Sequence, residues 1–239
     1  MRIAIVSDIH GNRTAFEAVV ADLRLTAPDL ILHGGDLAAS GANPAEIVDR
    51  MRDLGWPGVV GNTDELLFRP ESLQEFAKQS TAPQSLFAAI EEMAMATREA
   101  LGENRLAWLR ELPCVQQDGA IALVHASPCD LWRAPAPEAS DSELESTYGQ
   151  LGLPIIVYAH IHQPFVRNIS TRTIANTGSV SLSYDGDQRA SYLLVDDATP
   201  SIRRVSYEVN GELQLLSACA LPHADWVART LQSARPQMP

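Results

Sequence analysis

The sequence predicts a mixed α/β (α+β) fold, and two patterns support this prediction. Over the first two thirds of the chain, short apolar runs alternate with amphipathic segments of helical period. The last third changes to strand-like runs separated by short turns, such as the polar stretch 184–187. No linker, internal repeat or low-complexity tract divides the 239 residues, so we expect one domain over residues 1–239.

The first three expected strands each precede a polar residue. The runs 3–7, 30–32 and 58–60 lead to Asp8, Asp36 and Asn62, in that order. Roughly 30 residues separate each polar residue from the next, which is the length of a strand–helix–strand unit. This spacing predicts parallel strands whose carboxyl ends meet at the same end of one sheet.

Helices are expected between these strands. Thr14 and Glu17 form a capping-box pattern at the start of the first helix, and Asn43 with Pro44 is typical of an N-cap followed by the first helical residue. Residues 65–112 are expected to be mostly helical, as an insert of the domain.

The second half is expected to contain further strands. The runs 121–124 and 155–158 read as buried strands, with a polar helix over 142–151 between them. The segments 171–175, 191–195 and 202–209 are expected to form hairpins on a second sheet. A final helix is predicted over 225–232.

Composition limits the classes of partner and the compartment. A net charge of −12 argues against general nucleic-acid binding and against binding to anionic membranes. A small phosphorylated partner stays possible, because bound cations would reverse the local field. The three cysteines are far apart and read as free thiols, and we see neither a signal peptide nor an apolar stretch of membrane length. We therefore expect a cytoplasmic protein, and its oligomeric state stays open.

Side chains that can bind metal ions follow five of the apolar runs. In extended backbone, residues two apart point the same way, so Asp8 and His10 can both reach one cation. His160 and His162 have the same spacing and can place one imidazole on each of two neighbouring metal ions. Carboxylate, amide and imidazole donors without a thiolate suit Mn²⁺, our first expectation, or Fe, Zn²⁺, Ni²⁺ or Co²⁺. We predict two divalent ions, held by Asp8, His10, Asp36, Asn62, His125, His160 and His162.

The ordered blocks DIHGN, GGD, GNTD, VHASP and AHIH resemble the calcineurin-like metallophosphoesterase superfamily. The resemblance is strongest to its small prokaryotic branch of predicted phosphodiesterases and covers residues 1–209, including NTGSV at 176–180. It implies a four-layer β-sandwich flanked by helices, with a dinuclear site at the carboxyl ends of the strands. One metal would then take Asp8, His10 and His162, the other Asn62, His125 and His160, and Asp36 would bridge them.

The same resemblance implies a metal-dependent phosphoesterase. In that family a hydroxide held between the two ions attacks phosphorus in line with the leaving group, which would make Asp36, Asn62 and His125 catalytic. Asn12, Thr63 and Ser179 are candidate contacts to the substrate, although Asn12 is more typical of a helix cap.

Thr63 departs from the family pattern, because it stands where the family has a histidine that assists the leaving group. This departure favours a phosphodiesterase over a phosphomonoesterase. The alternatives are a dinucleoside polyphosphate hydrolase or a phosphoprotein phosphatase. A non-catalytic scaffold of the same fold would be expected to lack ligand residues, and all seven are present.

Two further polar residues, His33 and Asp64, lie next to the ligand motifs. His33 is out of phase with Asp36 and is expected to pack inside the protein. Asp64 could orient His125 or cap the helix that follows it. The sequence leaves the physiological substrate and the native metals open.

Overall fold

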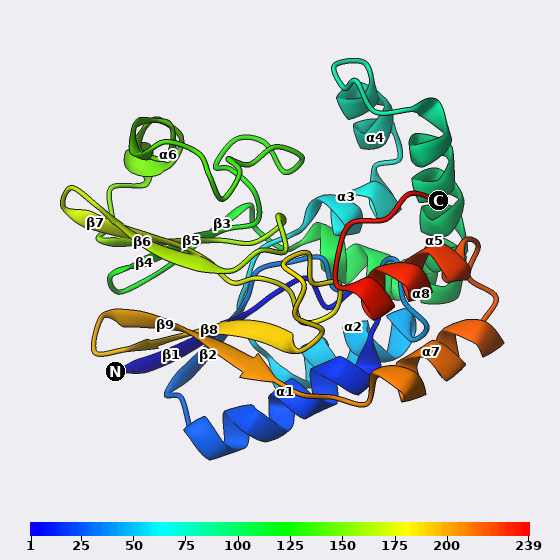
Figure 1. Cartoon of the computed structure of the whole chain (residues 1–239), viewed down its shortest axis with the longest axis horizontal. Helices are drawn as coiled ribbons and strands as arrows, with labels where there is room; N and C mark the ends of the chain where they lie inside the picture. The colour runs from blue at the N-terminus through cyan, green and yellow to red at the C-terminus, as the bar shows by residue number, and fades with distance from the viewer.

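The computed structural model describes all residues from Met1 to Pro239. Two β-sheets pack face to face, and helices cover both outer faces, which makes four layers (Figure 1). The strands are β1 (Arg2–Val6), β2 (Leu30–His33), β3 (Val115–Asp118), β4 (Ile121–Val124), β5 (Ile155–Tyr158), β6 (Phe165–Ile169), β7 (Arg172–Asn176), β8 (Ala190–Asp196) and β9 (Thr199–Val205).

The helices gather mostly at one end and on the face of the first sheet (Figure 1). They are α1 (Arg13–Thr26), α2 (Pro44–Leu54), α3 (Asn62–Phe68), α4 (Glu71–Ala77), α5 (Gln84–Arg110), α6 (Asp141–Tyr148), α7 (Val209–Ala218) and α8 (Ala224–Ser233). A 3₁₀ turn, η1 (Gly149–Leu151), follows α6. None of these helices combines the length and the apolar character that crossing a membrane requires.

Both sheets mix parallel and antiparallel strands. The first sheet has the order β2-β1-β8-β9, in which β1 and β2 are parallel and β8 and β9 form an antiparallel hairpin. The second has the order β3-β4-β5-β7-β6, in which β4, β5 and β7 are parallel. Asp36, which follows β2, lies 3.6 Å from His10, which follows β1, and from His125, which follows β4. The carboxyl ends of β1, β2 and β4, and of β5 parallel to β4, therefore meet at the same edge of the sandwich.

The alternation of side chains along β1 separates two cores. Ile3 and Ile5 belong to the apolar cluster between the sheets, whereas Ala4 and Val6 belong to the larger cluster under the helices. On the other face of the sandwich, Tyr148 of α6 packs on Tyr158 of β5, with ring centroids 4.9 Å apart. Each fully buried aliphatic or aromatic side chain contributes about 1.5–3 kcal/mol to the free energy of folding, compared with the same side chain exposed to water. Apolar packing therefore stabilises both faces of both sheets.

The structure confirms the mixed α/β sandwich and corrects several details. The metal-ligand segments come from two sheets and not from one, because β4 pairs with β3 and β5, whereas β1 pairs with β2 and β8. Residues 58–60 form only an isolated bridge from Gly58 to His33 in place of a third strand. The segments 171–175 and 191–195 do not share one second sheet, because β7 joins β5 and β8 joins β1.

The helix boundaries also differ in places from the expectation. The first helix is capped by Asn12, whose side chain accepts a hydrogen bond from the Ala15 N–H at 2.8 Å, and not by Thr14. Asn43 and Pro44 do start α2, but the Asn43 side chain makes no capping hydrogen bond. The strand expected over 202–209 ends at Val205 and is followed by the unpredicted helix α7. The short strands β3 and β6 were also not predicted.

Candidate metal centre

Tight turns place the predicted ligands just after the strands. Asp8, His10, Asp36, His160 and His162 all have positive φ, between 49° and 67°. Non-glycine residues rarely adopt this left-handed backbone, and such strain gathers at functional sites. The expectation of extended backbone at the two paired motifs was therefore wrong, since left-handed turns aim these side chains.

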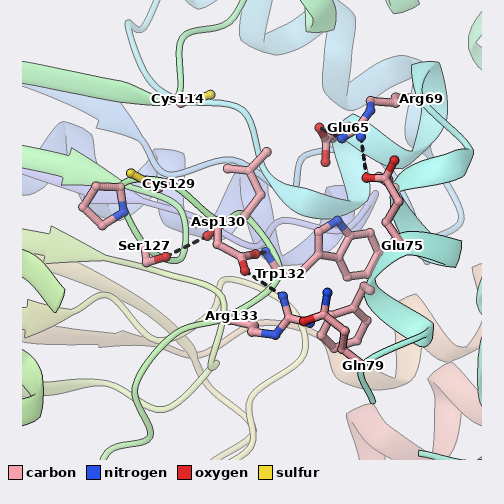
Figure 2. Close-up of a pocket in the computed structure, with 14 residues that line it drawn as sticks. Glu65, Arg69, Glu75, Gln79, Cys114, Ser127, Cys129, Asp130, Trp132 and Arg133 are labelled. Carbon is pink, nitrogen blue, oxygen red and sulfur yellow. Dashed lines mark hydrogen bonds and ion pairs between the residues drawn. The ribbon is translucent and has the colours of Figure 1, made fainter.

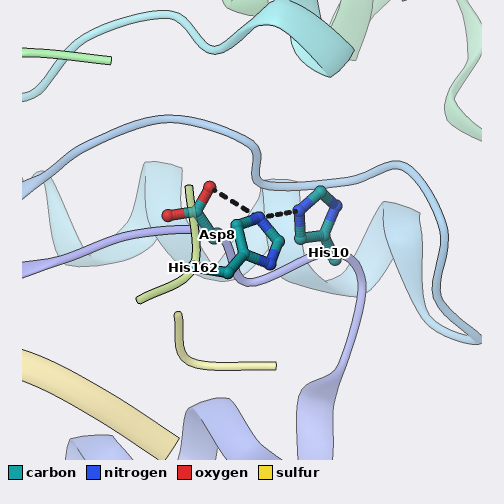
Figure 3. A group of neighbouring side chains, drawn as sticks. All are labelled: Asp8, His10 and His162. Carbon is teal, nitrogen blue, oxygen red and sulfur yellow. Dashed lines mark hydrogen bonds and ion pairs between the residues drawn. The ribbon is translucent and has the colours of Figure 1, made fainter. Parts of the chain in front are cut away.

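The first cluster consists of Asp8, His10 and His162 (Figure 3). The Nε2 atoms of the two histidines lie 3.3 Å apart, and His162 Nε2 lies 3.2 Å from Asp8 Oδ1. Each ring donates its Nδ1–H to a backbone carbonyl: His10 to Ala39 O at 2.9 Å and His162 to Leu182 O at 2.5 Å. In the neutral rings, two Nε2 lone pairs therefore face each other, and a cation between them relieves their repulsion.

The second cluster consists of Asn62, His125 and His160. Asn62 Oδ1 lies 2.8 Å from His125 Nε2 and 3.0 Å from His160 Nδ1. His125 is oriented like the first two histidines, because its Nδ1–H donates to Gly34 O at 2.7 Å. Its Nε2 lone pair thus faces the amide oxygen of Asn62, so that two electron-pair donors point at each other. A cation between them would bind both and relieve their repulsion.

Asp36 lies between the two clusters. Its Oδ2 is 3.6 Å from His10 Nε2, and its Oδ1 is 3.6 Å from His125 Nε2. Asp36 Oδ1 also accepts the backbone N–H of Thr63 at 2.9 Å, which holds the carboxylate in place. One oxygen toward each cluster is the geometry that a bridging carboxylate requires.

The donor set fits divalent ions. Two donors that each lie about 2.0–2.2 Å from one ion are about 3–3.5 Å apart, which is close to the spacings within both clusters. Asp8 Oδ1 is buried and accepts no hydrogen bond, so it is an unpartnered anionic oxygen aimed at the first cluster. A buried carboxylate oxygen without a partner is costly unless a cation or a proton meets it.

Burial lowers the pKa of His10 and of His160 and so keeps these two rings neutral, which is the form that binds metals. Desolvation lowers the pKa of His10, and desolvation reinforced by the neighbouring His125 lowers the pKa of His160 to about 4. His162 differs: burial opposes its protonation, but the adjacent Asp8 carboxylate outweighs burial and raises its pKa. Asp8 is also buried, yet His162 and the other histidines hold its pKa below the usual value.

Asp64 supports the centre without touching His125. Its Oδ1 accepts the Leu37 N–H at 2.9 Å, and its Oδ2 accepts the Gly61 N–H at 3.2 Å. Of the two roles considered, it therefore takes the helix-capping one, and it also ties α3 to the backbone beside Asp36. Burial and the nearby Asp36 raise the pKa of Asp64 to about 7.

Two of the three expected substrate contacts have structural hydrogen bonds instead. The Asn12 side chain caps α1 and donates to Ser181 Oγ at 3.1 Å. The Ser179 hydroxyl donates to Asp8 O at 2.9 Å and accepts two backbone N–H groups. Neither residue lines the cavity above the clusters, whereas Thr63 does, and its buried hydroxyl has no partner.

The cavity above the clusters has a volume of about 300 Å³. Five of the predicted ligands line its floor, and its walls are largely apolar. Tyr184 stacks on His162 with centroids 4.6 Å apart, and Trp226 comes from the C-terminal helix α8. Trp132, Tyr184 and Trp226 were not predicted as wall residues, because none of them lies within a metal-binding motif. His33, as expected, is buried and packs near Trp108 outside this cavity.

Comparison with known proteins places this geometry in a family. The sequence model of the calcineurin-like phosphoesterase superfamily domain matches residues 1–199. The chain belongs to this superfamily. A crystal structure of a metallophosphoesterase from Sphaerobacter thermophilus superposes with a TM-score of 0.79 at 25% identity, covering 98% of this chain and 99% of that one.

Two curated relatives are similar in sequence. An uncharacterized protein of Methanocaldococcus jannaschii is 29% identical over 252 residues, covering 96% of each chain. A symmetrical bis(5'-nucleosyl)-tetraphosphatase of Methylococcus capsulatus is 30% identical over 150 residues, which is 61% of this chain and 50% of that protein. A phosphoesterase with candidate metal-ligand groups is therefore the level of function that these relationships support.

Proposed function

We propose that this calcineurin-like phosphoesterase is a phosphodiesterase with two divalent metal ions. The observation that carries the dinuclear assignment is the position of Asp36, with one carboxylate oxygen facing each cluster. Asp8, His10 and His162 would hold one ion, and Asn62, His125 and His160 the other. When bound, the two ions would supply an activated water and neutralise charge on the phosphoryl group.

The charge of the cavity supports a diester substrate. No lysine or arginine is among the fifteen residues that line it. A phosphate monoester carries about −1.5 to −2 charge near pH 7, whereas a diester carries a single charge. A cavity whose cationic groups are the metal ions alone favours the less charged ester, because every further anionic oxygen would be desolvated without a partner.

The chain's own residues would position the substrate. Thr63 offers an unpartnered hydroxyl at the cavity wall, which can hydrogen-bond an ester or phosphoryl oxygen. A hydroxyl with the pKa of threonine does not protonate a leaving group as an imidazolium does, which again favours esters with good leaving groups. Ile90, Met93 and Leu182 line the wall and would exclude water from the reacting group.

A dinucleoside polyphosphate hydrolase is the second candidate, and the Methylococcus capsulatus relative motivates it. Its substrates carry several negative charges in a row, and the cavity lacks the arginine or lysine side chains that would bind them. A phosphoprotein phosphatase would meet the same objection, since its substrate is a monoester. A scaffold without catalysis is disfavoured by the retention of all seven ligand residues.

The proposed ions are Mn²⁺ first, with Fe, Zn²⁺, Ni²⁺ or Co²⁺ as alternatives, because the donors are nitrogen and oxygen only. We also propose a single domain over residues 1–239, because α8 lies beyond residue 199 and yet lines the same cavity as the metal ligands. The three cysteines are free, which favours the cytoplasm as the location.

Rates with three substrates test the proposal. We expect Mn²⁺-dependent hydrolysis of bis(p-nitrophenyl) phosphate to exceed that of p-nitrophenyl phosphate and of diadenosine tetraphosphate. Asp8→Asn should abolish it, whereas Asp53→Asn, an exposed change on α2, should not. Faster hydrolysis of the monoester or of the tetraphosphate would refute the diester assignment. No turnover of any of the three with any of these metals would refute the enzyme assignment.

A further inference from the structure

A second cavity of about 370 Å³ shares a wall with the metal cavity, and Figure 2 shows the residues that line it. It is lined by residues of α3 and α4 and by the loop 127–133. Trp132 lines both this side cavity and the metal cavity. Helix α3 also connects them, since Thr63 lines the metal cavity and Glu65 and Arg69 line the side cavity. Thr63 and Glu65 are two residues apart, so their side chains point to different faces of the helix, and Trp132 is the wall that the two cavities share.

The charges in the side cavity are internally balanced. Arg69 donates to Glu65 at 3.0 Å and to Glu75 at 2.5 Å, and Arg133 donates to Asp130 at 2.8 Å. Each guanidinium is therefore already paired with a carboxylate, and three carboxylates stand against two guanidinium groups. An anionic phosphate would have to break an ion pair to bind here, so the side cavity suits a neutral group.

The wall of the side cavity is aromatic and flat. Phe76 and Trp132 stack with ring centroids 5.2 Å apart and an interplanar angle of 22°. The Arg133 guanidinium lies 5.0 Å from the Phe76 ring centroid. In Figure 2 the Trp132 indole lies between the Glu65 side and the Arg133 side of the cavity. Trp132 and Arg133 therefore cover the Phe76 ring, and the aromatic wall favours a planar ligand that packs against it in an offset or edge-to-face arrangement.

Two polar atoms of the lining have no hydrogen-bond partner. They are the hydroxyl of Ser72, a residue that is 2% exposed, and the indole Nε1–H of Trp132. A buried polar group without a partner costs about 1–3 kcal/mol, so such groups in the wall of a cavity mark hydrogen bonds that a ligand can complete. A ligand here would need an acceptor for the indole N–H and a donor or acceptor for the hydroxyl.

We propose that the side cavity binds a neutral, planar heterocycle of the nucleobase type, carried by one ester group of the substrate. The inference rests on the proposed phosphodiesterase function and narrows its substrates to nucleoside phosphodiesters. The edge of the heterocycle accepts the Trp132 N–H, which points outward in the plane of the indole, and the Ser72 hydroxyl completes its second hydrogen bond. The phosphodiester group lies over the metal centre on the other side of Trp132.

Equilibrium dialysis with adenosine, a nucleoside without phosphate, tests the side cavity apart from catalysis. Wild-type protein should bind adenosine more tightly than ribose. Ser72→Ala or Trp132→Phe, which each remove one hydrogen-bonding group, should weaken adenosine binding about three- to tenfold. Ser217→Ala on the exposed face of α7 and Trp108→Phe on α5 are the matched controls and should bind adenosine as wild type does. Equal weak binding of adenosine and ribose, or wild-type affinity in both cavity variants, would overturn the proposal.

Two diesters with the same leaving group provide the second measurement. Thymidine 5'-(p-nitrophenyl) phosphate presents a base, and methyl p-nitrophenyl phosphate does not. In Ser72→Ala and in Trp132→Phe, KM for the thymidine ester should rise about three- to tenfold relative to KM for the methyl ester. An equal change for both esters would indicate a structural role and overturn the inference. If wild type hydrolyses neither ester, the proposed function fails, while the adenosine measurement still decides whether the side cavity binds a base.

Discussion

Replacing the bridging carboxylate is the sharpest test of the dinuclear centre. Asp36→Asn is nearly isosteric, and its amide oxygen can still accept the Thr63 N–H that Asp36 Oδ1 accepts at 2.9 Å. The change removes one negative charge and one anionic oxygen. Since each Asp36 oxygen lies 3.6 Å from a histidine nitrogen of one cluster, an ion in either cluster lies within about 4 Å of that charge. A unit charge pair at 4 Å is worth about 4 kcal/mol at an effective dielectric constant near 20.

This energy corresponds to about a thousandfold in affinity, and solvent entering the site would reduce it toward a hundredfold. We therefore expect Asp36→Asn to bind Mn²⁺ about a hundred- to thousandfold more weakly, as measured by calorimetric titration. Diester hydrolysis at limiting Mn²⁺ should fall in parallel. Asp53→Asn, which removes an exposed charge on α2, should bind two equivalents as wild type does. If Asp36→Asn also bound two equivalents with affinity within threefold of wild type, Asp36 would not bridge two ions.

Three further changes test other parts of the structure. Thr63→His should raise hydrolysis of p-nitrophenyl phosphate relative to the diester by at least about tenfold, and an unchanged ratio would contradict the leaving-group argument. Gly61→Ala should lower both the free energy of unfolding and the affinity for Mn²⁺, because the added Cβ would lie 2.0 Å from Asp36 Oδ1. Gly211→Ala is the control, since its added Cβ would lie 3.7 Å from the nearest atom, Glu208 Cβ. Equal behaviour of the two variants would exclude the steric argument. Burial lowers the pKa of His33 in the folded protein to about 4, whereas its pKa in the unfolded chain is near 6.5. Between these two values the unfolded chain binds a proton that the folded protein does not bind. The free energy of unfolding therefore falls as the pH is lowered from about 6.5 to about 4. Urea unfolding of the metal-free protein measures how much the free energy of unfolding falls between pH 7 and pH 5. This fall should be about 2 kcal/mol smaller in His33→Leu than in wild type. Identical falls in the two proteins would show that His33 is not buried in its neutral form.

Apolar runs and helical periodicity predicted those strands and helices whose formation depends on residues close together in the sequence. The apolar runs that became β1, β4 and β5 and the helical period of α1 lie in single short windows, so burial and periodicity sufficed to find them. The edge strand β3, with the sequence VQQD, carries no such signal, because its partner β4 and not its own composition makes it a strand. The run 58–60 had the apolar signal but found a partner only at Gly58.

The sequence by itself determined which chemical groups the centre can contain, because a metal-binding motif needs only donor residues placed after a strand. The tertiary structure alone decided how those donors meet: two sheets supply them, and left-handed turns at residues such as Asp8 and His162 aim them. It also decided what surrounds them, since Trp132 and Trp226 reach the same cavity from segments far apart in the chain. Distances between such segments follow from the packing of the whole sandwich, and no local window of residues contains that information.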